Sequence, residues 1–279
     1  MLRPLKTADP ITTLRKGRIC TRRHGESSVS LAIHPGRNAR FRREAVLFAM
    51  LNQSAIGRAR HRAGTRPPAI LFDLDGTLID SIELILASMR YAFDKCEAPA
   101  PSDAEWLAGV GTPLRTMFEH YTSDEESIGR FIAAYREHQL ANHDRLVRSF
   151  EDVPQTIAAL KSAGHPLAVV TSKTGALAQR GLEHVGLAHY FDTIVGCDSC
   201  TRHKPHPEPV LMALNRLGYE PEEALFVGDS VHDIESGNAA GVLTIAALWG
   251  PFTRDQLAVA EPGRYLERAG ELLQVLAER

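Results

Sequence analysis

Residues 70–80 read ILFDLDGTLID, and this stretch decides the fold. Three apolar residues run into Asp73, Asp75 follows two positions later, and Gly76 and Thr77 then end the run. A short apolar run closed by a turn signal is typical of a buried strand, and residues two apart in an extended segment face the same side. Two carboxylates at the end of such a strand are costly unless a cation or a reaction requires them. The stretch predicts either a nucleophile beside an acid/base or a metal site, against the alternative of a loop with two solvated acids.

The composition is that of an ordinary globular protein: 44% of the 279 residues are hydrophobic and 24% are charged, which is enough to build a proper core. No apolar stretch approaches the roughly 18 residues of a membrane-spanning helix, so none is expected. Four cysteines give no disulfide framework in a chain of this length and favour a reducing compartment. We therefore predict a cytoplasmic protein without a membrane partner, with import into an organelle as an open alternative.

The first 66 residues differ in charge from the rest of the chain. They hold 15 Lys and Arg against 3 Asp and Glu, whereas residues 67–279 hold 17 against 31. High net charge with few apolar residues predicts a disordered extension. Three interpretations of residues 1–66 stay open: an organellar transit peptide, a nucleic-acid-binding arm, or a dispensable segment that precedes a true start at Met50. Among these, nucleic-acid binding has the least support.

From Pro67 onward, strand patterns alternate with helix patterns, which predicts an α/β fold with a doubly wound, Rossmann-like parallel sheet. Residues 67–80 and 151–279 are expected to form this core domain. Residues 81–150 interrupt it and show only helical patterns, so an all-helical inserted domain is predicted there. Strands are expected at 69–73, 167–171, 193–195, 224–227 and 242–246; helices are expected at 82–96, 103–108, 114–121, 125–143, 153–163, 175–185, 207–217 and 231–240, with only helices after residue 246.

Polar side chains gather where the predicted strands end. Thr171 ends the second strand, Asp229 follows the fourth with Asp233 four residues later, and Lys204 precedes a helix in the segment HKPHPEP. Ligands of open parallel sheets bind beyond the carboxyl ends of the strands, so these groups are expected to meet Asp73 and Asp75. Each has an ordinary alternative: Asp229 or Ser230 could cap a helix, and Lys204 could be a solvated loop residue. Together, hard oxygen ligands, a hydroxyl and one lysine suit Mg²⁺ and phosphoryl transfer.

These segments resemble the four motifs of the haloacid dehalogenase-like hydrolase superfamily, in the family's order and over about residues 67–250. The resemblance implies that Asp73 is the nucleophile, forming an aspartyl-phosphate, and that Asp75 is the acid/base. It implies that Thr171 holds a phosphoryl oxygen and that Lys204 pairs with the phosphoryl group and the nucleophile. For Mg²⁺ it implies three ligands, with Asp233 orienting them: the carboxylates of Asp73 and Asp229, and the backbone carbonyl of Asp75.

Within the family, the second carboxylate, Asp75, is similar to the phosphatase pattern, because members that cleave carbon–halogen bonds lack it. Residues 81–150 resemble the helical cap that sets specificity in this class. The segment Gly109–Pro113 resembles the cap loop that reaches the substrate, although an ordinary helix–helix turn is an equal alternative. The substrate-binding residues expected on this basis are Gly111, Thr112, Arg115, Thr171 and Ser172.

Two small, doubly anionic substrates compete. FDLDGTLIDS, VVTSKT and HKPHPEPVLMAL are most similar to the phosphoglycolate phosphatase group and nearly as similar to related inorganic pyrophosphatases. A small phosphorylated metabolite is thus the expected partner, and Mg²⁺ the expected cofactor. A function of another class, a catalytically silent binding protein with a nucleic-acid-binding arm, also stays open. A zinc or redox site at Cys197 and Cys200 is a weaker alternative, since no second CxxC pair is present.

Overall fold

The computed structural model describes residues 66–278, so the predictions for most of the basic extension lie outside the described residues. Its centre is a six-stranded sheet in which every strand pair is parallel, in the order β5-β4-β1-β6-β7-β8. This confirms the doubly wound α/β prediction. The strands are β1 (Ala69–Phe72), β4 (Leu167–Val170), β5 (Thr193–Val195), β6 (Ala224–Gly228), β7 (Leu243–Ala247) and β8 (Arg264–Leu266).

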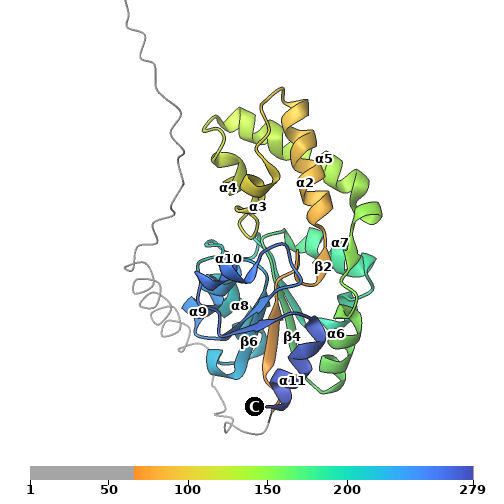
Figure 1. Cartoon of the computed structure of the whole chain (residues 1–279), viewed down its shortest axis with the longest axis vertical. Helices are drawn as coiled ribbons and strands as arrows, with labels where there is room; N and C mark the ends of the chain where they lie inside the picture. Colours follow the sequence, from red (N-terminus) through yellow and green to blue (C-terminus); the bar gives the residue numbers. More distant parts are fainter. Residues whose placement is uncertain (1–65, 279) are drawn as a thin grey trace, which may run out of the picture. The chain divides into compact units, whose positions relative to one another are not determined.

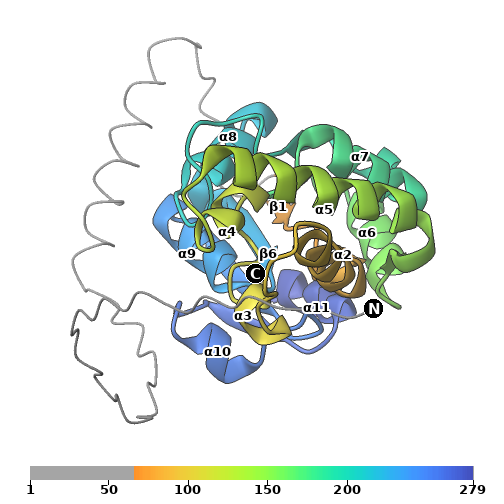
Figure 2. The ribbon, with the colours of Figure 1, turned by 90° about the horizontal axis from the view of Figure 1, so that it is seen from above.

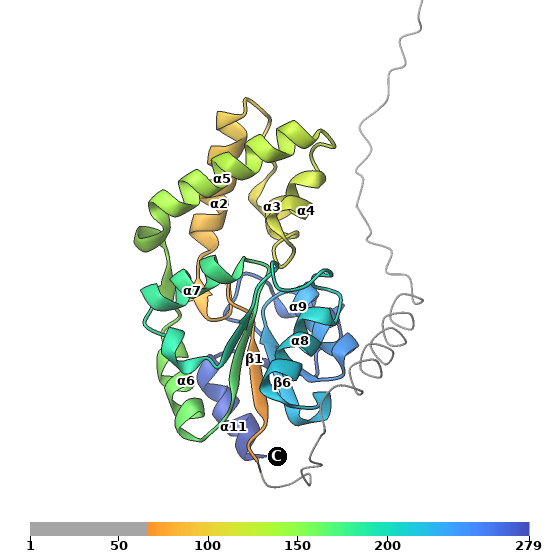
Figure 3. The ribbon, with the colours of Figure 1, turned by 180° about the vertical axis from the view of Figure 1, so that it is seen from behind.

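Helices cover both faces of the sheet because successive strand residues point to opposite sides. In β1, Ile70 and Phe72 join one buried cluster while Ala69 and Leu71 join another. The first cluster packs against α6 (Val153–Ser162), α7 (Gly175–His184) and α11 (Leu272–Ala277). The second packs against α8 (Glu208–Leu217) and reaches α9 (Val231–Ala240), and α9 also contacts α10 (Arg254–Ala258). Figure 3 shows α6 and α11 on one side of β1 and α8 and α9 on the other.

The inserted segment forms the four expected helices: α2 (Ile82–Lys95), α3 (Asp103–Leu107), α4 (Leu114–Glu119) and α5 (Glu125–Leu146). They share a hydrophobic cluster of their own, centred on Phe93, Trp106, Phe118 and Phe131. Figure 1 shows these helices beyond the end of the sheet, and the view from above in Figure 2 shows α2, α4 and α5 around the end of β1. A separate core therefore stands over the carboxyl ends of the strands.

Two predicted details are wrong. Residues 81–150 were expected to be all-helical, yet β3 (Arg148–Ser149) pairs antiparallel with β2 (Ile79–Asp80), where the chain enters and leaves the insert. The region after residue 246 was expected to be helical, yet β8 extends the sheet beside β7. Both strands are two or three residues long, too short to give a period-two pattern. Their partners lie distant in the sequence, so only the folded chain reveals them.

None of the helices within residues 66–278 is long and apolar enough to cross a membrane. Arg66, the last residue of the predicted extension, contacts the core: its guanidinium lies 2.6 Å from a carboxylate oxygen of Glu223 and stacks 3.5 Å from the ring centre of Tyr219.

Candidate active site

The end of β1 places Asp73 in the centre of the sheet edge. The strand AILF is fully buried, and the Asp73 N–H continues its ladder by donating to the Val227 carbonyl at 2.9 Å. The side chain is nearly inaccessible, and one of its oxygens, Oδ1, accepts a hydrogen bond from Lys204 Nζ at 2.6 Å. The structure therefore brings Lys204 to this carboxylate.

The Lys204 ammonium has no free donor. Besides Asp73, it donates to Asp233 Oδ1 at 2.5 Å and to the Val170 carbonyl at 3.3 Å. Asp233 sits in the first turn of α9, and its other oxygen accepts from the backbone N–H and the hydroxyl of Ser230, the N-cap residue. Thus Ser230, rather than Asp229, caps the helix, and Asp233 is satisfied on both oxygens. This leaves Asp233 as the group that fixes Lys204.

Asp229 is buried with one oxygen unsatisfied. Its Oδ1 accepts a hydrogen bond from the Thr77 hydroxyl at 2.7 Å, but no side chain or backbone donor reaches Oδ2 among the described residues. Oxygen atoms of Asp73, Asp229 and Asp233 lie within 4.8 Å of one another. A buried carboxylate oxygen without a donor costs free energy unless a cation takes the donor's place. These hard oxygen donors fit Mg²⁺.

The charges around this cluster do not balance. Burial and the neighbouring Asp233 raise the pKa of Asp73 to about 7, although Lys204 opposes the shift. Burial and the Asp73 carboxylate raise the pKa of Asp229 well above its usual range. Burial lowers the pKa of Lys204, but the charges of Asp233 and Asp73 outweigh this effect and raise the pKa overall. The lysine therefore stays charged. Three carboxylates share one lysine, an excess that a divalent cation would neutralise.

Gly76 makes room for Asp229. Its φ of +84° lies in the left-handed region, and a Cβ atom at this position would stand 2.3 Å from Asp229 Oδ2. Gly250 also packs against this residue, since a Cβ there would lie 2.5 Å from that of Asp229. The two glycines therefore leave the space that the Asp229 side chain occupies.

We expect Gly76→Ala to weaken divalent-cation binding at least tenfold, because the new methyl group must displace Asp229 Oδ2. Isothermal titration with Mg²⁺ measures this directly. Gly129→Ala is the matched control, since a Cβ there meets nothing within 4 Å. Unchanged Mg²⁺ affinity in a folded Gly76→Ala protein would contradict this role of Gly76.

Asp75 points away from this cluster. Its carboxylate oxygen Oδ1 accepts short hydrogen bonds from the Ser81 hydroxyl and from Lys173 Nζ. Both ends of the ion pair with Lys173 are mostly buried. Neither Lys173 nor Ser81 was predicted as a site residue. The available signal was that Lys173 lies within three residues of the end of β4.

Thr171 and Ser172 follow β4 and border the same space. Thr171 is buried, and its hydroxyl oxygen accepts a hydrogen bond from the backbone N–H of Lys173 at 3.2 Å. The Ser172 hydroxyl donates to the carbonyl of Gly111 in the insert. Gly111 has a φ of +101°, and a Cβ there would lie 2.7 Å from Ser230 Oγ. The segment around Gly111 and Thr112 is thus packed directly on the strand ends.

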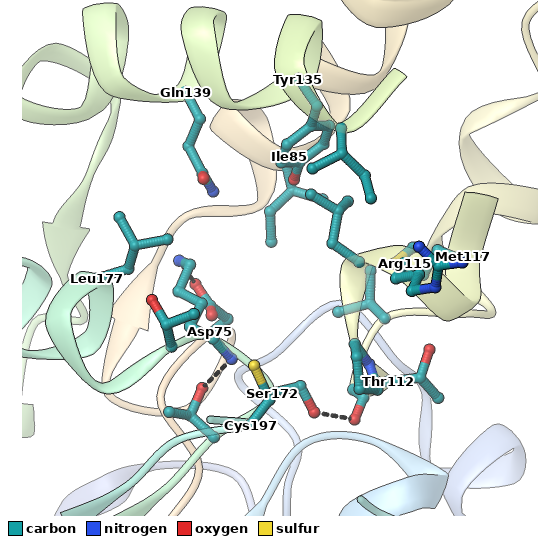
Figure 4. A pocket seen from close by; sticks show the side chains of 18 of the residues that line it. Asp75, Ile85, Thr112, Arg115, Met117, Tyr135, Gln139, Ser172, Leu177 and Cys197 are labelled. Carbon is teal, nitrogen blue, oxygen red and sulfur yellow. Dashed lines mark hydrogen bonds and ion pairs between the residues drawn. The ribbon is translucent and has the colours of Figure 1, made fainter. Parts of the chain in front are cut away.

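A cavity of about 170 Å³ lies between the strand ends and the insert, and Figure 4 shows its lining. Asp73, Asp75, Thr171, Ser172, Gly111, Thr112 and Arg115 all line it, so the structure brings together these seven predicted site residues. Arg115 lies across the cavity from Asp75 (Figure 4). Its guanidinium forms ion pairs with Glu119 at 2.9 Å and Glu125 at 2.5 Å. Substrate contact by Arg115 stays a prediction.

The two cysteines of the CxxC segment lie at the margin of this site. Cys197 lines the cavity, and Cys200 Sγ stands 4.0 Å from His203 Nδ1. Burial raises the pKa of Cys197, and it raises the pKa of Cys200 to about 11. Within residues 66–278, the side chains close enough to share a metal ion are those of Asp73, Asp229 and Asp233, and neither cysteine belongs to this group.

The comparison with known families decides the identity. Residues 70–247 match the family described as haloacid dehalogenase-like hydrolase, and the match contains all four motifs and the insert. The chain belongs to the haloacid dehalogenase-like hydrolase family. The hydrolase is 39% identical over 210 residues to Pyrophosphatase PpaX of Bacillus velezensis, covering 75% of this chain and 96% of that protein.

Solved structures agree with this assignment. The hydrolase superposes on a predicted phosphoglycolate phosphatase of Haemophilus somnus with a TM-score of 0.68 and 27% identity, over 76% of this chain and 98% of the other. It superposes on a predicted phosphatase of Clostridium acetobutylicum with a TM-score of 0.69 and 29% identity, over 77% and 100%. Both matches cover nearly the whole length of the other chain.

Proposed function

We propose that this hydrolase is a phosphatase that cleaves a small phosphorylated metabolite through an aspartyl-phosphate on Asp73. The single observation that supports this most is the buried Asp73 carboxylate at the centre of the sheet edge, held by Lys204 and facing the cavity that Asp75 also lines. A carboxylate fixed in this way is positioned to attack phosphorus in line.

The two carboxylates of DLDGT take separate steps in this proposal. Asp73 Oδ forms a bond to phosphorus while the bond from phosphorus to the leaving oxygen breaks. Asp75 in its protonated form gives its proton to that oxygen, then takes a proton from the water that attacks the phosphorus of the intermediate and frees Asp73. Lys173 and Ser81 hold the Asp75 carboxylate in the cavity for both transfers.

For the cofactor we propose Mg²⁺, held by the carboxylates of Asp73 and Asp229 and by the backbone carbonyl of Asp75. The unsatisfied Oδ2 of Asp229 supports this choice. The bound cation would neutralise charge on the phosphoryl oxygens. Asp233 stays outside this set because Lys204 and Ser230 occupy its oxygens.

Without divalent cations, we expect the stability of the protein to fall as the pH rises from about 4 toward 7. The folded state raises the pKa of Asp73 from 3.8 to about 7, so in this window the folded chain binds more protons than the unfolded chain and loses that advantage as the pH increases. Mg²⁺ should reverse the trend, adding about 5–10 °C to the melting temperature at pH 8 at a hundredfold excess over its Kd, and less at pH 6.

Thermal melts with and without Mg²⁺ over pH 5–8 measure this effect. The Asp229→Asn variant, which keeps an acceptor for Thr77, serves as the comparison because it removes a ligand charge. Equal Mg²⁺ stabilisation at pH 6 and pH 8, or in Asp229→Asn, would contradict the proposed metal site.

Pyrophosphate is the favoured substrate, since the relatives named Pyrophosphatase PpaX align over nearly their whole length. 2-Phosphoglycolate is the second candidate, supported by the structural neighbour of that name. A panel of phosphorylated metabolites with Mg²⁺ and the full chain separates them by kcat/KM. No hydrolysis of any small phosphoester or of pyrophosphate would refute the proposed function.

We also propose that residues 81–150 act as a cap domain and that the hydrolase works in the cytoplasm. The separate hydrophobic cluster of α2–α5 supports the first proposal. The free thiols of Cys96, Cys197 and Cys200 support a reducing compartment.

A further inference from the structure

The wall of the cavity opposite the strand ends comes from α5 and contains a buried amide without a partner. Gln139 is only 5% exposed, and none of the hydrogen bonds within residues 66–278 involves its side chain. Figure 4 shows it descending from α5 with its amide end directed into the cavity, toward the side of Asp75 and Leu177. The amide atoms face the open space of the cavity instead of a protein partner, so they are available to a ligand there.

Arg136 lines the same cavity three residues earlier on α5, so it shares a helix face with Gln139. The other basic side chains at or near this wall are compensated: Arg115 pairs with Glu119 and Glu125, and Lys173 pairs with Asp75. Among the cations that line the cavity in the described chain, Arg136, an exposed residue at its edge, is the one without a carboxylate partner. Its charge also reaches the opposite rim, where it opposes the burial-driven rise in the pKa of Cys197.

Tyr135 belongs to the same wall of the cavity. Its ring is buried, and burial together with the charge of Asp75 raises the pKa of its hydroxyl. Tyr135 and Gln139 are four residues apart, hence one turn apart on the same face of α5. The polar side chains of this face therefore stand over the point where a leaving oxygen would meet Asp75.

Part of the cavity wall contributed by the insert is apolar. A phosphoryl group at Asp73 places the leaving group beyond Asp75, between the polar face of α5 and an apolar surface. A charged leaving group would be poorly solvated against the apolar surface. That surface consists of Ile85, Val110, Leu114, Met117 and Ile132.

We propose that Gln139 and Arg136 form a subsite for the anionic end of the leaving group, and that this subsite selects substrates whose leaving group carries a phosphate or a carboxylate. The inference rests on the proposed phosphatase function and deepens it. Arg136 supplies the charge, and the Gln139 amide donates a hydrogen bond to the same anion. In this arrangement α5, rather than Arg115, distinguishes a substrate with a second anionic group in its leaving group from a simple phosphomonoester.

The test compares substrates that differ only in the leaving group: pyrophosphate, 2-phosphoglycolate and phenyl phosphate. Gln139→Met keeps the length and burial of the side chain but removes the amide, and Arg136→Met removes the charge. We expect each to lower kcat/KM for pyrophosphate, 2-phosphoglycolate or both about 10- to 100-fold, mainly through KM. Phenyl phosphate hydrolysis should change less than about threefold, and Arg136→Lys should recover most of the loss. Arg130→Met, on the same helix with only a Ser127 contact, is the matched control.

Binding supplies a readout that does not depend on turnover. The Kd of methylenediphosphonate, measured by calorimetry, should rise by a similar factor in Gln139→Met and Arg136→Met, while that of phenylphosphonate stays unchanged. The proposed subsite would be wrong if kcat/KM fell equally for all three substrates. It would also be wrong if kcat/KM fell for neither pyrophosphate nor 2-phosphoglycolate. If the unmodified protein hydrolyses none of them, the proposed function fails, and the calorimetry alone then decides whether the subsite stands.

Discussion

Asp73→Asn is expected to lower kcat/KM by a factor of about 10⁴ or more while the protein stays folded. The amide is a poor nucleophile toward phosphorus and cannot form the aspartyl-phosphate. The substitution keeps an acceptor for Lys204, which also remains paired with Asp233. Because burial and Asp233 raise the pKa of Asp73, loss of its charge relieves repulsion, and the melting temperature without Mg²⁺ should rise at pH 8.

A fall in kcat/KM together with a rise in melting temperature distinguishes a nucleophile from a structural residue, whose loss would lower both. Asp80→Asn is the control, since Asp80 is exposed and only its Oδ1 contacts the Ile82 N–H, at 3.4 Å. It should change kcat/KM by no more than about twofold. A folded Asp73→Asn protein that keeps a tenth of the original turnover would be incompatible with the proposed role.

Lys204→Met is expected to reduce the free energy of unfolding by about 3–5 kcal/mol and to abolish measurable activity. The ammonium is fully buried and makes three hydrogen bonds, two of them to the carboxylates of Asp73 and Asp233. Its removal leaves two buried acids without a counter-ion. Chemical denaturation at pH 8 measures the loss.

The cause of that loss can be isolated with a second substitution. Asp233→Asn in the Lys204→Met background removes one of the stranded charges and keeps the acceptor for Ser230, so it should restore part of the stability but none of the activity. Lys161→Met, which breaks a partly exposed pair with Asp192 at 2.7 Å, should cost no more than about 1 kcal/mol. A Lys204→Met protein as stable as the Lys161→Met control would show that the hydrogen bonds of Lys204 to Asp73 and Asp233 contribute little to the free energy of unfolding.

The strand ends explain why the sequence predicted most of this site. Asp73, Thr171 and Asp229 each follow an apolar run, and parallel strands bring such positions to one edge whatever the details of packing. Lys204 could be included because its segment precedes a helix of the same sheet. The sheet, its covering helices and the helical insert could be predicted because each element has a local hydrophobic pattern of its own, and strand and helix patterns alternate along the chain.

The partners of Asp75 and the polar face of α5 could not be predicted in this way. The Asp75–Lys173 pair joins residues 98 apart in the sequence, and no local pattern specifies which lysine reaches which acid. Gln139 carries no motif; it stands out only because its helix is folded over the cavity with the amide unpaired. The short strands β3 and β8 were missed because they are set by their distant partners, Ile79–Asp80 and β7.

The most direct test of the account is to locate the covalent intermediate. The full chain is mixed with Mg²⁺ and pyrophosphate, or with the best substrate of the panel, then quenched in acid and reduced with borohydride. This treatment converts an acyl phosphate of aspartate into homoserine, which mass spectrometry of the peptides can place. The account predicts homoserine at position 73 in samples that received substrate and none in samples without it. Turnover without any modification at position 73, or homoserine at position 75, 229 or 233 instead, would contradict it.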